Sequence, residues 1–342
     1  YNSYGKREGL LMGVVATLLN PSLLATTAIF IIIWGMLAIG LNMHWGETGL
    51  LNFAHAAFFA VGAYTSAILT TPPPEGGAIL EATRTIGFDL PIVVGMIGAI
   101  VVTAVIGVAI GATSIRLEDD YLAIVTLAGA EIIRLIIINQ GSLTAGTKPI
   151  KNIPRPLEGT FQEVLGLGLP YRVYYVGIAG IVLLGTLLMF RHLSNSPFGR
   201  VLNAIREDEE VPKALGRDTA RYKLKSFGLG AGVAGLAGAL FAHSQNAIIA
   251  SQFTASLTFI IWAAVIIGGS GNYVGAVVGA GFILGLQALL RVVPSGIPVI
   301  GGNIAVLRPI IVGILLIVIL YARPQGLLGN KQQTLAGMKE GS

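Results

Sequence analysis

Two groups of polar residues lie in stretches of this sequence that are otherwise apolar. The first group lies in LNMHWGETGLLNFAHAAFFAVGAY, residues 41–64, and comprises Asn42, His44, Glu47, Asn52 and His55. Such side chains can hydrogen bond to a solute in transit or to a neighbouring helix. A charged group at bilayer depth costs at least about 2.5 kcal/mol, so polar residues there usually face a path or a partner.

Asn52 and His55 are three positions apart, which predicts that they share one face of a helix. Two interpretations remain open for this pair. Their small neighbours favour close helix packing with interhelical hydrogen bonds, whereas a polar face inside the membrane could also line a translocation path. Glu47 lies in the break WGETG and is expected to cap the N-terminus of the next helix.

The second group is Glu131 and Arg134, an i, i+3 pair within one predicted helix. The pair could be a self-contained ion pair, or it could meet the ammonium and carboxylate of an amino acid passing through the membrane. Arg308, beside Pro309, is a further candidate without an identified partner. His243, at the end of a glycine-rich stretch, is expected to extend towards the outer interface.

The composition indicates which kind of fold holds these residues. Of 342 residues, 54% are hydrophobic and only 11% are charged, and the mean hydropathy is +0.77. These values predict an all-α, polytopic transmembrane bundle, with one membrane domain over 1–330 and a short tail over 331–342. The absence of cysteine excludes disulfides, thiolate nucleophiles and cysteine-ligated metal, and we predict no metal site.

Apolar stretches predict about ten membrane crossings, because a spanning helix needs about 20 mostly apolar residues. Shorter stretches could instead be broken or re-entrant helices, so the expected number is about eight to ten. Seven long spans are predicted near 21–45, 49–70, 90–115, 121–139, 172–190, 226–247 and 304–321, and three shorter runs near 10–20, 256–269 and 273–290.

The distribution of basic residues predicts the orientation. Loop 191–225 carries eight Lys and Arg residues, and short loops rich in these residues stay in the cytoplasm. With ten spans, both termini are then cytoplasmic and the protein lies in the cytoplasmic membrane. The proline-containing loops 71–89 and 140–171 are placed outside, where they either form simple turns or receive a delivery protein. The net charge is +5, but because the basic residues are concentrated in one loop, nucleic acid is not an expected partner.

Loop 191–225 also has a pattern of its own. Val201, Leu202 and Ile205 recur at helical spacing beside polar residues, Pro212 fits a first helical turn, and Gly216 fits a helix end. We predict a short amphipathic helix lying at the membrane face.

Several ordered motifs together resemble the branched-chain amino acid permease family of ABC importers, in its LivM-like branch. They are WGETGLLNFAHAAFFAVGAYT, DYLAIVTLAGAEIIRL, LTAGTKPIKNIPRP, SPFGRVLNAIREDEEVPKALG, RYKLKSFGLGAGVAGLAGALFAH, IGGSGNYVGAVVGAG and RPQGLLG. In such permeases a cytoplasmic helix with an EAA…G pattern contacts the ATPase. The resemblance therefore implies ATPase coupling through the segment EEVPKALG, at Glu209, Glu210, Ala214, Leu215 and Gly216.

The resemblance also implies substrate and partners. The substrate would be a branched-chain or other hydrophobic amino acid, with urea or a short-chain amide as the alternative. The partners would be a homologous LivH-like permease, two ATP-binding subunits and an extracytoplasmic substrate-binding protein. The sequence contains no G-x-x-x-x-G-K-[ST] phosphate loop, so we expect no catalytic residue or cofactor on this chain, with ATP hydrolysed by the partner subunits. Candidate residues of the translocation path are Asn52, His55, Glu131 and Arg134.

Three other functions remain to be weighed. A passive channel for a small solute could use Asn and His as pore lining, but it leaves the charged loop 191–225 unexplained. A proton-coupled transporter would need a buried carboxylate, for which Glu131 is the candidate. An intramembrane serine protease would use Ser270 in GGSG, but all four histidines precede that serine, whereas the rhomboid pattern needs a later one.

Overall fold

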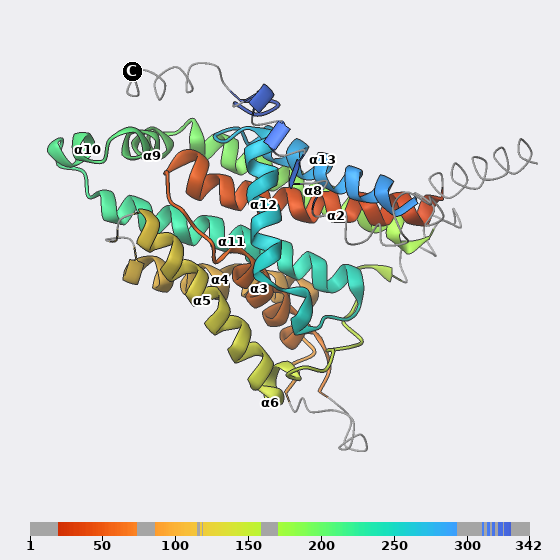
Figure 1. Ribbon diagram of the computed structural model, residues 1–342. Coiled ribbons are helices and arrows are strands. Elements are labelled where there is room, and N and C mark those ends of the chain that lie inside the picture. The colour runs from red at the N-terminus through yellow and green to blue at the C-terminus, as the bar shows by residue number, and fades with distance from the viewer. Residues whose placement is uncertain are drawn as a thin grey trace, which may run out of the picture.

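The computed structural model describes residues 20–73, 86–114, 117, 119–158 and 170–292, and individual positions between 310 and 329. Helices dominate this part of the chain, and its only β pairing is an isolated bridge between Ile150 and Ile248 (Figure 1). Nearly all of the predicted span 10–20, most of the span 304–321 with Arg308, and the tail 331–342 lie outside the described residues.

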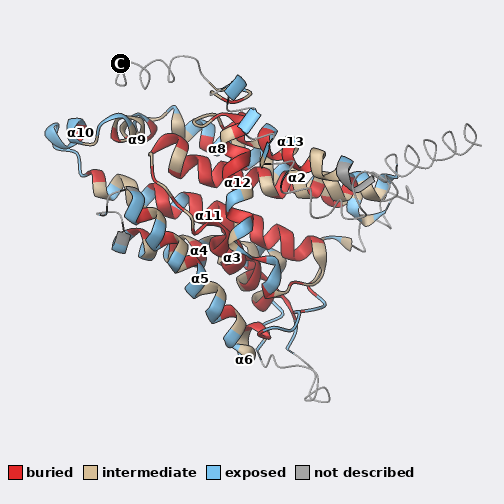
Figure 2. Cartoon of the chain, in the orientation of Figure 1, coloured by how far each residue is buried: buried red, intermediate tan, exposed pale blue. Residues whose placement is uncertain are grey.

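The centre of the bundle consists of α2 (Pro21–Asn42), α3 (His55–Thr70) and α11 (Thr219–Gln245). At its C-terminal end α2 continues into a five-residue π-helical turn, η1 (Met43–Glu47). In the most apolar stretch of α11, 78% of the residues are buried, against 22% in α4 (Ile92–Ser114), α5 (Asp119–Asn139) and α8 (Tyr171–Ser194). α11 is therefore a core helix, and the other three expose apolar side chains on the outside of the bundle (Figure 2).

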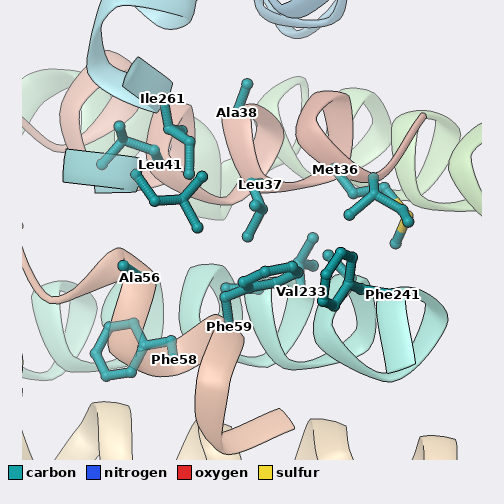
Figure 3. Close-up of a cluster of buried hydrophobic side chains, with 14 of the residues drawn as sticks. Met36, Leu37, Ala38, Leu41, Ala56, Phe58, Phe59, Val233, Phe241 and Ile261 are labelled. Carbon is teal, nitrogen blue, oxygen red and sulfur yellow. The ribbon is translucent and has the colours of Figure 1, made fainter. Parts of the chain in front are cut away.

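Small residues let the central helices approach closely. A Cβ added to Gly62 of α3 would collide with the backbone of Gly235 in α11. Close approach of this kind is how helices associate inside a membrane, where burial of apolar surface gives little net driving force. Between α2 and the α3–α11 pair, Leu37, Phe59 and Phe241 belong to one apolar cluster (Figure 3), and the ring centroids of Phe59 and Phe241 are 5.2 Å apart.

The remaining elements complete the bundle. They are α6 (Gly141–Thr144), α9 (Pro197–Glu207), α10 (Glu210–Ala214), η2 (Ala250–Gln252), α12 (Ala255–Gly268) and α13 (Tyr273–Val292). Six helical segments of the described chain are long and apolar enough to cross a membrane, and α3 and the stretch Tyr273–Leu289 of α13 are shorter apolar helices. The prediction of an all-α, polytopic membrane bundle is confirmed.

Two predicted boundaries were wrong. The expected span 49–70 is helical only from His55, because residues 49–54 are irregular: Gly49 has φ +79° and the Asn52 side chain accepts a hydrogen bond from Ala54 N at 2.8 Å. α11 starts at Thr219 rather than near 226, since Asp218 caps it by accepting from Arg221 N at 3.2 Å. The predicted run 256–269 agrees with α12 within one residue, and the stretch Ala250–Gly268 around it is long enough to span, which was one of the interpretations left open.

Candidate functional site

The polar residues of 41–64 meet where α2 ends in the π-helical turn η1. Asn52 Oδ1 accepts from Ala54 N, so its Nδ2 donates to His44 Nδ1, 2.9 Å away. The proton of His44 is then on Nε2, which donates to the carbonyl of Phe227 in α11 at 3.1 Å. Both side chains are fully buried. This chain of hydrogen bonds joins η1, the segment 49–54 and α11.

The π-helical turn itself depends on tight packing. Asn42 Oδ1 accepts from Gly271 N at 2.9 Å, which attaches the end of α2 to the connection between α12 and α13. A Cβ at Gly46 would collide with both Asn42 Oδ1 and Gly271 N. Turns of this kind insert an extra residue into a helix and are frequent at functional sites.

His55 makes a second contact between segments. It is the first residue of α3, and its Nε2 donates to the carbonyl of Leu37 in α2 at 2.8 Å. Its ring centroid is 5.8 Å from that of His44. The expectation that Asn52 and His55 share a helix face was wrong, because Asn52 precedes α3. Each residue nevertheless forms a hydrogen bond that joins its own segment to another segment of the core.

The segment 49–54 is fixed on both sides by neighbouring helices. Trp262 Nε1 of α12 donates to the carbonyl of Asn52 at 3.1 Å, and Phe53 N donates to Thr126 Oγ1 of α5 at 3.0 Å. The Phe53 ring stacks on that of Trp262 with a centroid separation of 5.1 Å. An irregular backbone inside the bundle is thereby satisfied by protein groups, as the membrane interior requires.

Glu47 is a buried carboxylate at the end of η1, and it does not cap α3, whose N-cap is Ala54. Its Oε1 accepts from Ser194 Oγ of α8 at 2.6 Å. The guanidinium of Arg206 in α9 donates to the carbonyl of Gly46 at 2.5 Å. The turn η1 is therefore attached to both α8 and α9.

Glu131 and Arg134 form the ion pair that the sequence suggested. Arg134 donates from Nε to Glu131 Oε2 at 2.8 Å, and from its NH2 to Oε1 at 2.5 Å. The Glu131 side chain is 48% exposed and that of Arg134 is 30% exposed. Ile132 and Ile136, also exposed, flank them on α5. The structure does not bring this pair together with Asn52 and His55, which are buried in the core.

His243 is buried, and the expectation that it reaches the outer interface was wrong. Its Nδ1 lies 2.7 Å from the carbonyl of Pro154, to which it must donate, so Nε2 accepts from Ser66 Oγ at 2.9 Å. The same loop is held by Ile153 N, which donates to the carbonyl of Asn246 at 3.1 Å. His243 therefore attaches the proline-containing loop to α3 and α11.

The ends of the predicted loop 191–225 belong to α8 and α11, and the residues between them form two short helices outside the bundle. α9 is capped by Ser196, whose Oγ accepts from Phe198 N at 3.2 Å, and it buries Leu202 and Ile205. The amphipathic helix predicted from Val201, Leu202 and Ile205 is confirmed as α9, but Pro212 belongs to a second, separate helix, and the position at the membrane face stays a prediction. α10 follows at the left edge of Figure 1, and Gly216 beyond it has φ +77°. Next to α10, Leu215 is 76% exposed.

The two glutamates assigned to ATPase coupling differ in their surroundings. Glu209 accepts from Thr219 Oγ1 at 2.7 Å and forms an ion pair with Lys223, both in α11. Partial burial alone would raise the pKa of Glu209, but these hydrogen bonds and the positive charges of Lys223 and Lys213 hold it below its usual value. Glu210 is exposed and pairs with Lys213 at 3.0 Å. Glu209 thus holds α10 to α11, and Glu210 faces outward.

Sequence reasoning missed four residues that complete these contacts: Ser194, Arg206, Thr219 and Lys223. Arg206 and Lys223 were counted only as basic residues of the loop. Their partners are remote in the sequence, as for Arg206 and Gly46, or lie across a turn, as for Lys223 and Glu209. Helical spacing gives no signal for either pair.

A bundle of apolar spanning helices with a helix pair projecting from one side is the architecture of a polytopic membrane protein. Residues 23–320 match the family model described as "Branched-chain amino acid transport system / permease component". The chain therefore belongs to this permease family.

Individual relatives agree with this assignment. The chain is 31% identical to the high-affinity branched-chain amino acid transport system permease protein LivM of Escherichia coli K12, over 86% of this chain and 68% of that protein. It is 30% identical to the probable LivM of Methanocaldococcus jannaschii, over 89% and 93%. Identity to LivH of Escherichia coli K12 is 27%, over 87% and 92%. No solved structure matches the chain.

Proposed function

We propose that this chain is one of two homologous permease subunits of an ABC importer that moves branched-chain or other hydrophobic amino acids. The observation that carries the proposal is the similarity along most of the chain to both LivM and LivH, which are two permeases of Escherichia coli named for the same transport activity. The greater similarity to LivM assigns this chain the LivM-like role. Urea or a short-chain amide is the alternative substrate.

The energy for transport would come from two separate ATP-binding subunits, because the chain has no phosphate-binding loop of its own. The surface that would meet them is α10 with its following turn, where Glu210, Val211 and Leu215 are exposed outside the bundle. Exposed apolar residues beside charged ones suit a protein interface. ATP would be bound by those subunits alone.

Movement of this surface would be transmitted to the core by two routes. Glu209 links α10 to Lys223 and Thr219 in α11. On the other route, Arg206 of α9 holds Gly46, which belongs to the turn η1. η1 then reaches α11 through His44 and the carbonyl of Phe227. Because packed helices move as rigid bodies between discrete arrangements, a shift of α9 and α10 would reposition η1.

The path itself would run between this chain and the second permease. Glu131 and Arg134 lie on the outward face of α5, so a substrate in such an interface could present its ammonium to one and its carboxylate to the other. Asn52 and His55 would border the path only if segment 49–54 separated from α11, and their contacts favour a positioning role.

We further propose one transmembrane domain over 1–330 with a tail over 331–342, in the cytoplasmic membrane with both termini in the cytoplasm. The eight basic residues of 191–225 support this orientation. An extracytoplasmic binding protein would then deliver substrate on the opposite side, near the loop that His243 anchors.

The test is to co-express the chain with its genomic neighbours, purify it, identify its stoichiometric companions, and measure solute uptake in proteoliposomes. Co-purification of two ATPase subunits and a second permease, with ATP-dependent uptake of leucine, is the expected result. ATP-dependent uptake of urea without leucine would overturn the substrate assignment. A homo-oligomer with ATP-independent flux would overturn the importer proposal and favour a channel.

A further inference from the structure

An open apolar groove lies on the outside of the bundle, between α4 and α8. α8 packs mainly against α2, whereas α11 packs mainly against α4 and α3, so α8 and α4 diverge and leave α11 exposed between them. The groove has a volume of about 800 Å³. Val108 lines it from α4, Gly185 and Met189 from α8, and Gly232 from α11.

The two ends of the groove differ in chemistry. Its walls are almost entirely apolar, but at the end near α9 it is lined by Phe198 and Lys225. Lys225 is exposed, and its ammonium lies 6.0 Å from the centre of the Tyr222 ring. None of the ion pairs among the described residues involves Lys225. A positive charge is therefore available at one end of the apolar groove.

The length of the groove matches one leaflet of a bilayer. Its α11 floor runs from Lys225 to Leu236, which at 1.5 Å per residue is about 16 Å. The hydrocarbon core of a membrane is about 30 Å thick, so one leaflet contributes about 15 Å. Acyl chains that begin beside Lys225 would end near Leu236.

The chemistry of the groove selects between its possible occupants. Its lining is apolar apart from Thr186 and one ammonium, that of Lys225, at one end. This arrangement matches a molecule that has hydrocarbon chains and an anionic head. An ammonium at the interface attracts anionic lipid headgroups.

We propose that this groove is a binding site for an anionic phospholipid from the leaflet on the α9 side. Its acyl chains lie between α4 and α8 on the floor formed by α11, and its headgroup phosphate pairs with Lys225. The site requires only that the chain span a bilayer, and it is independent of the transported substrate.

Gly185 offers a way to fill the groove without disturbing the protein. It lines the groove, and a Cβ built on it meets no atom within 4 Å. Gly185→Leu therefore places a side chain where the acyl chains would lie. Gly177 is on the same helix, is also free of neighbours within 4 Å, and is outside the groove lining, so Gly177→Leu is a matched control.

The experiment uses the full chain, purified with the subunits that accompany it and reconstituted in nanodiscs. The probes are phosphatidylglycerol and phosphatidylcholine, each with a diazirine on its acyl chain, and mass spectrometry locates the adducts. We expect phosphatidylglycerol to label peptides of α8 and α11 preferentially, Gly185→Leu to reduce this labelling at least about fivefold, and Gly177→Leu to leave it unchanged. Lys225→Gln should remove the preference for phosphatidylglycerol, whereas Arg217→Gln, an exposed basic residue outside the groove lining, should not.

Equal labelling of wild type and Gly185→Leu, or adducts spread evenly over the exposed faces of α4, α5 and α8, would overturn the site. Equal labelling by the two lipids in wild type would overturn the role of Lys225. A photoreactive amino acid at position 189 that cross-links to a second protein subunit instead of to lipid would show that a partner chain covers the groove, which also contradicts the proposal.

Discussion

The guanidinium of Arg206 in α9 donates a hydrogen bond to the carbonyl oxygen of Gly46 in the π-helical turn η1, at 2.5 Å. A helix outside the bundle is thereby joined directly to the backbone of a turn that also contains His44, whose side chain reaches α11 in the core. A displacement of α9 would therefore act on η1 directly through this hydrogen bond.

Replacing Arg206 tests this connection. Arg206→Ala removes a charged donor from a carbonyl in a well-packed turn, which costs about 1.5–3 kcal/mol, and we expect uptake to fall while the companion subunits still co-purify. Lys keeps the charge without the planar guanidinium, so Arg206→Lys should be intermediate. Arg200→Ala, an exposed arginine of the same helix, is the control. Wild-type uptake by Arg206→Ala would contradict transmission through Gly46.

Glu47 is predicted to stabilise the same turn through its contact with Ser194. Glu47→Ala deletes the acceptor for a hydroxyl at 2.6 Å and opens a cavity among α2, α8 and α9. Loss of a partner by a buried polar group costs about 1–3 kcal/mol. The unfolding temperature in detergent should fall, and Glu47→Gln, which can still accept from Ser194, should retain most of the stability. Equal losses for Gln and Ala would mean that the negative charge matters more than the acceptor.

The sequence predicted much of the bundle but not how its polar residues connect. Spans such as 90–115 and 172–190 were found within a few residues, because the length of an apolar stretch determines whether it can cross a membrane. The break at 49–54 was missed because Leu50, Leu51 and Phe53 continue the apolar pattern. Besides the local bond from Ala54 N to the Asn52 side chain, a tertiary contact holds this segment out of α3: Trp262 donates to the backbone of Asn52 at 3.1 Å.

In the candidate site, too, the sequence did not show which groups are hydrogen bonded to one another. His44 was recognised as an unusual residue, but its partner is the carbonyl of Phe227, 183 positions later in the chain. A backbone carbonyl leaves no mark in the sequence, so no pattern of side chains could have revealed this bond. By contrast, Glu131 and Arg134 are partners on one helix, and their spacing was enough to predict the ion pair.

Measuring thermal stability and uptake separately tests whether Asn52 and His55 hold the core helices in position or line the translocation path. Asn52→Ala leaves His44 Nδ1 and Ala54 N without their partners, and a buried orphan group costs about 1–3 kcal/mol. His55→Ala similarly removes the donor to the Leu37 carbonyl. We expect lower thermal stability in both variants with an unchanged KM for uptake. A raised KM at wild-type stability would instead place these residues in the path.

Glu209 and Glu210 should respond differently to charge reversal. Glu209→Lys places a second positive charge beside Lys223, so uptake should be lost. The double variant Glu209→Lys/Lys223→Glu restores the ion pair and should recover uptake. Glu210→Lys should also impair uptake, because Glu210 faces outward, but Lys223→Glu should not rescue it. Failure of the swap for Glu209 would indicate that its carboxylate contacts another subunit.

The pKa of Glu209 adds a pH dependence to this contact. Its pKa is lower in the folded protein than in the unfolded chain, so the stabilisation is present above the unfolded value of about 4.3 and is lost as the pH falls through the lower folded value. Unfolding temperatures measured in detergent between about pH 3 and pH 6 should decline more for wild type than for Glu209→Gln. Parallel curves would mean that the ion pair with Lys223 contributes little.

Exchanging the two charges of the ion pair on α5 tests most directly whether the pair has a structural role or contacts the substrate. The exchange Glu131→Arg/Arg134→Glu keeps an i, i+3 ion pair on the same exposed face of α5, so each charge still has its partner within the spanning helix. If a substrate's ammonium meets Glu131 and its carboxylate meets Arg134, the exchanged pair presents each charge in the wrong order. We then expect normal assembly with uptake reduced about tenfold, the effect of roughly 1.4 kcal/mol. Unchanged uptake by the exchanged variant, with a loss only in Glu131→Gln, would show that α5 needs a neutralised pair and that the substrate path lies elsewhere.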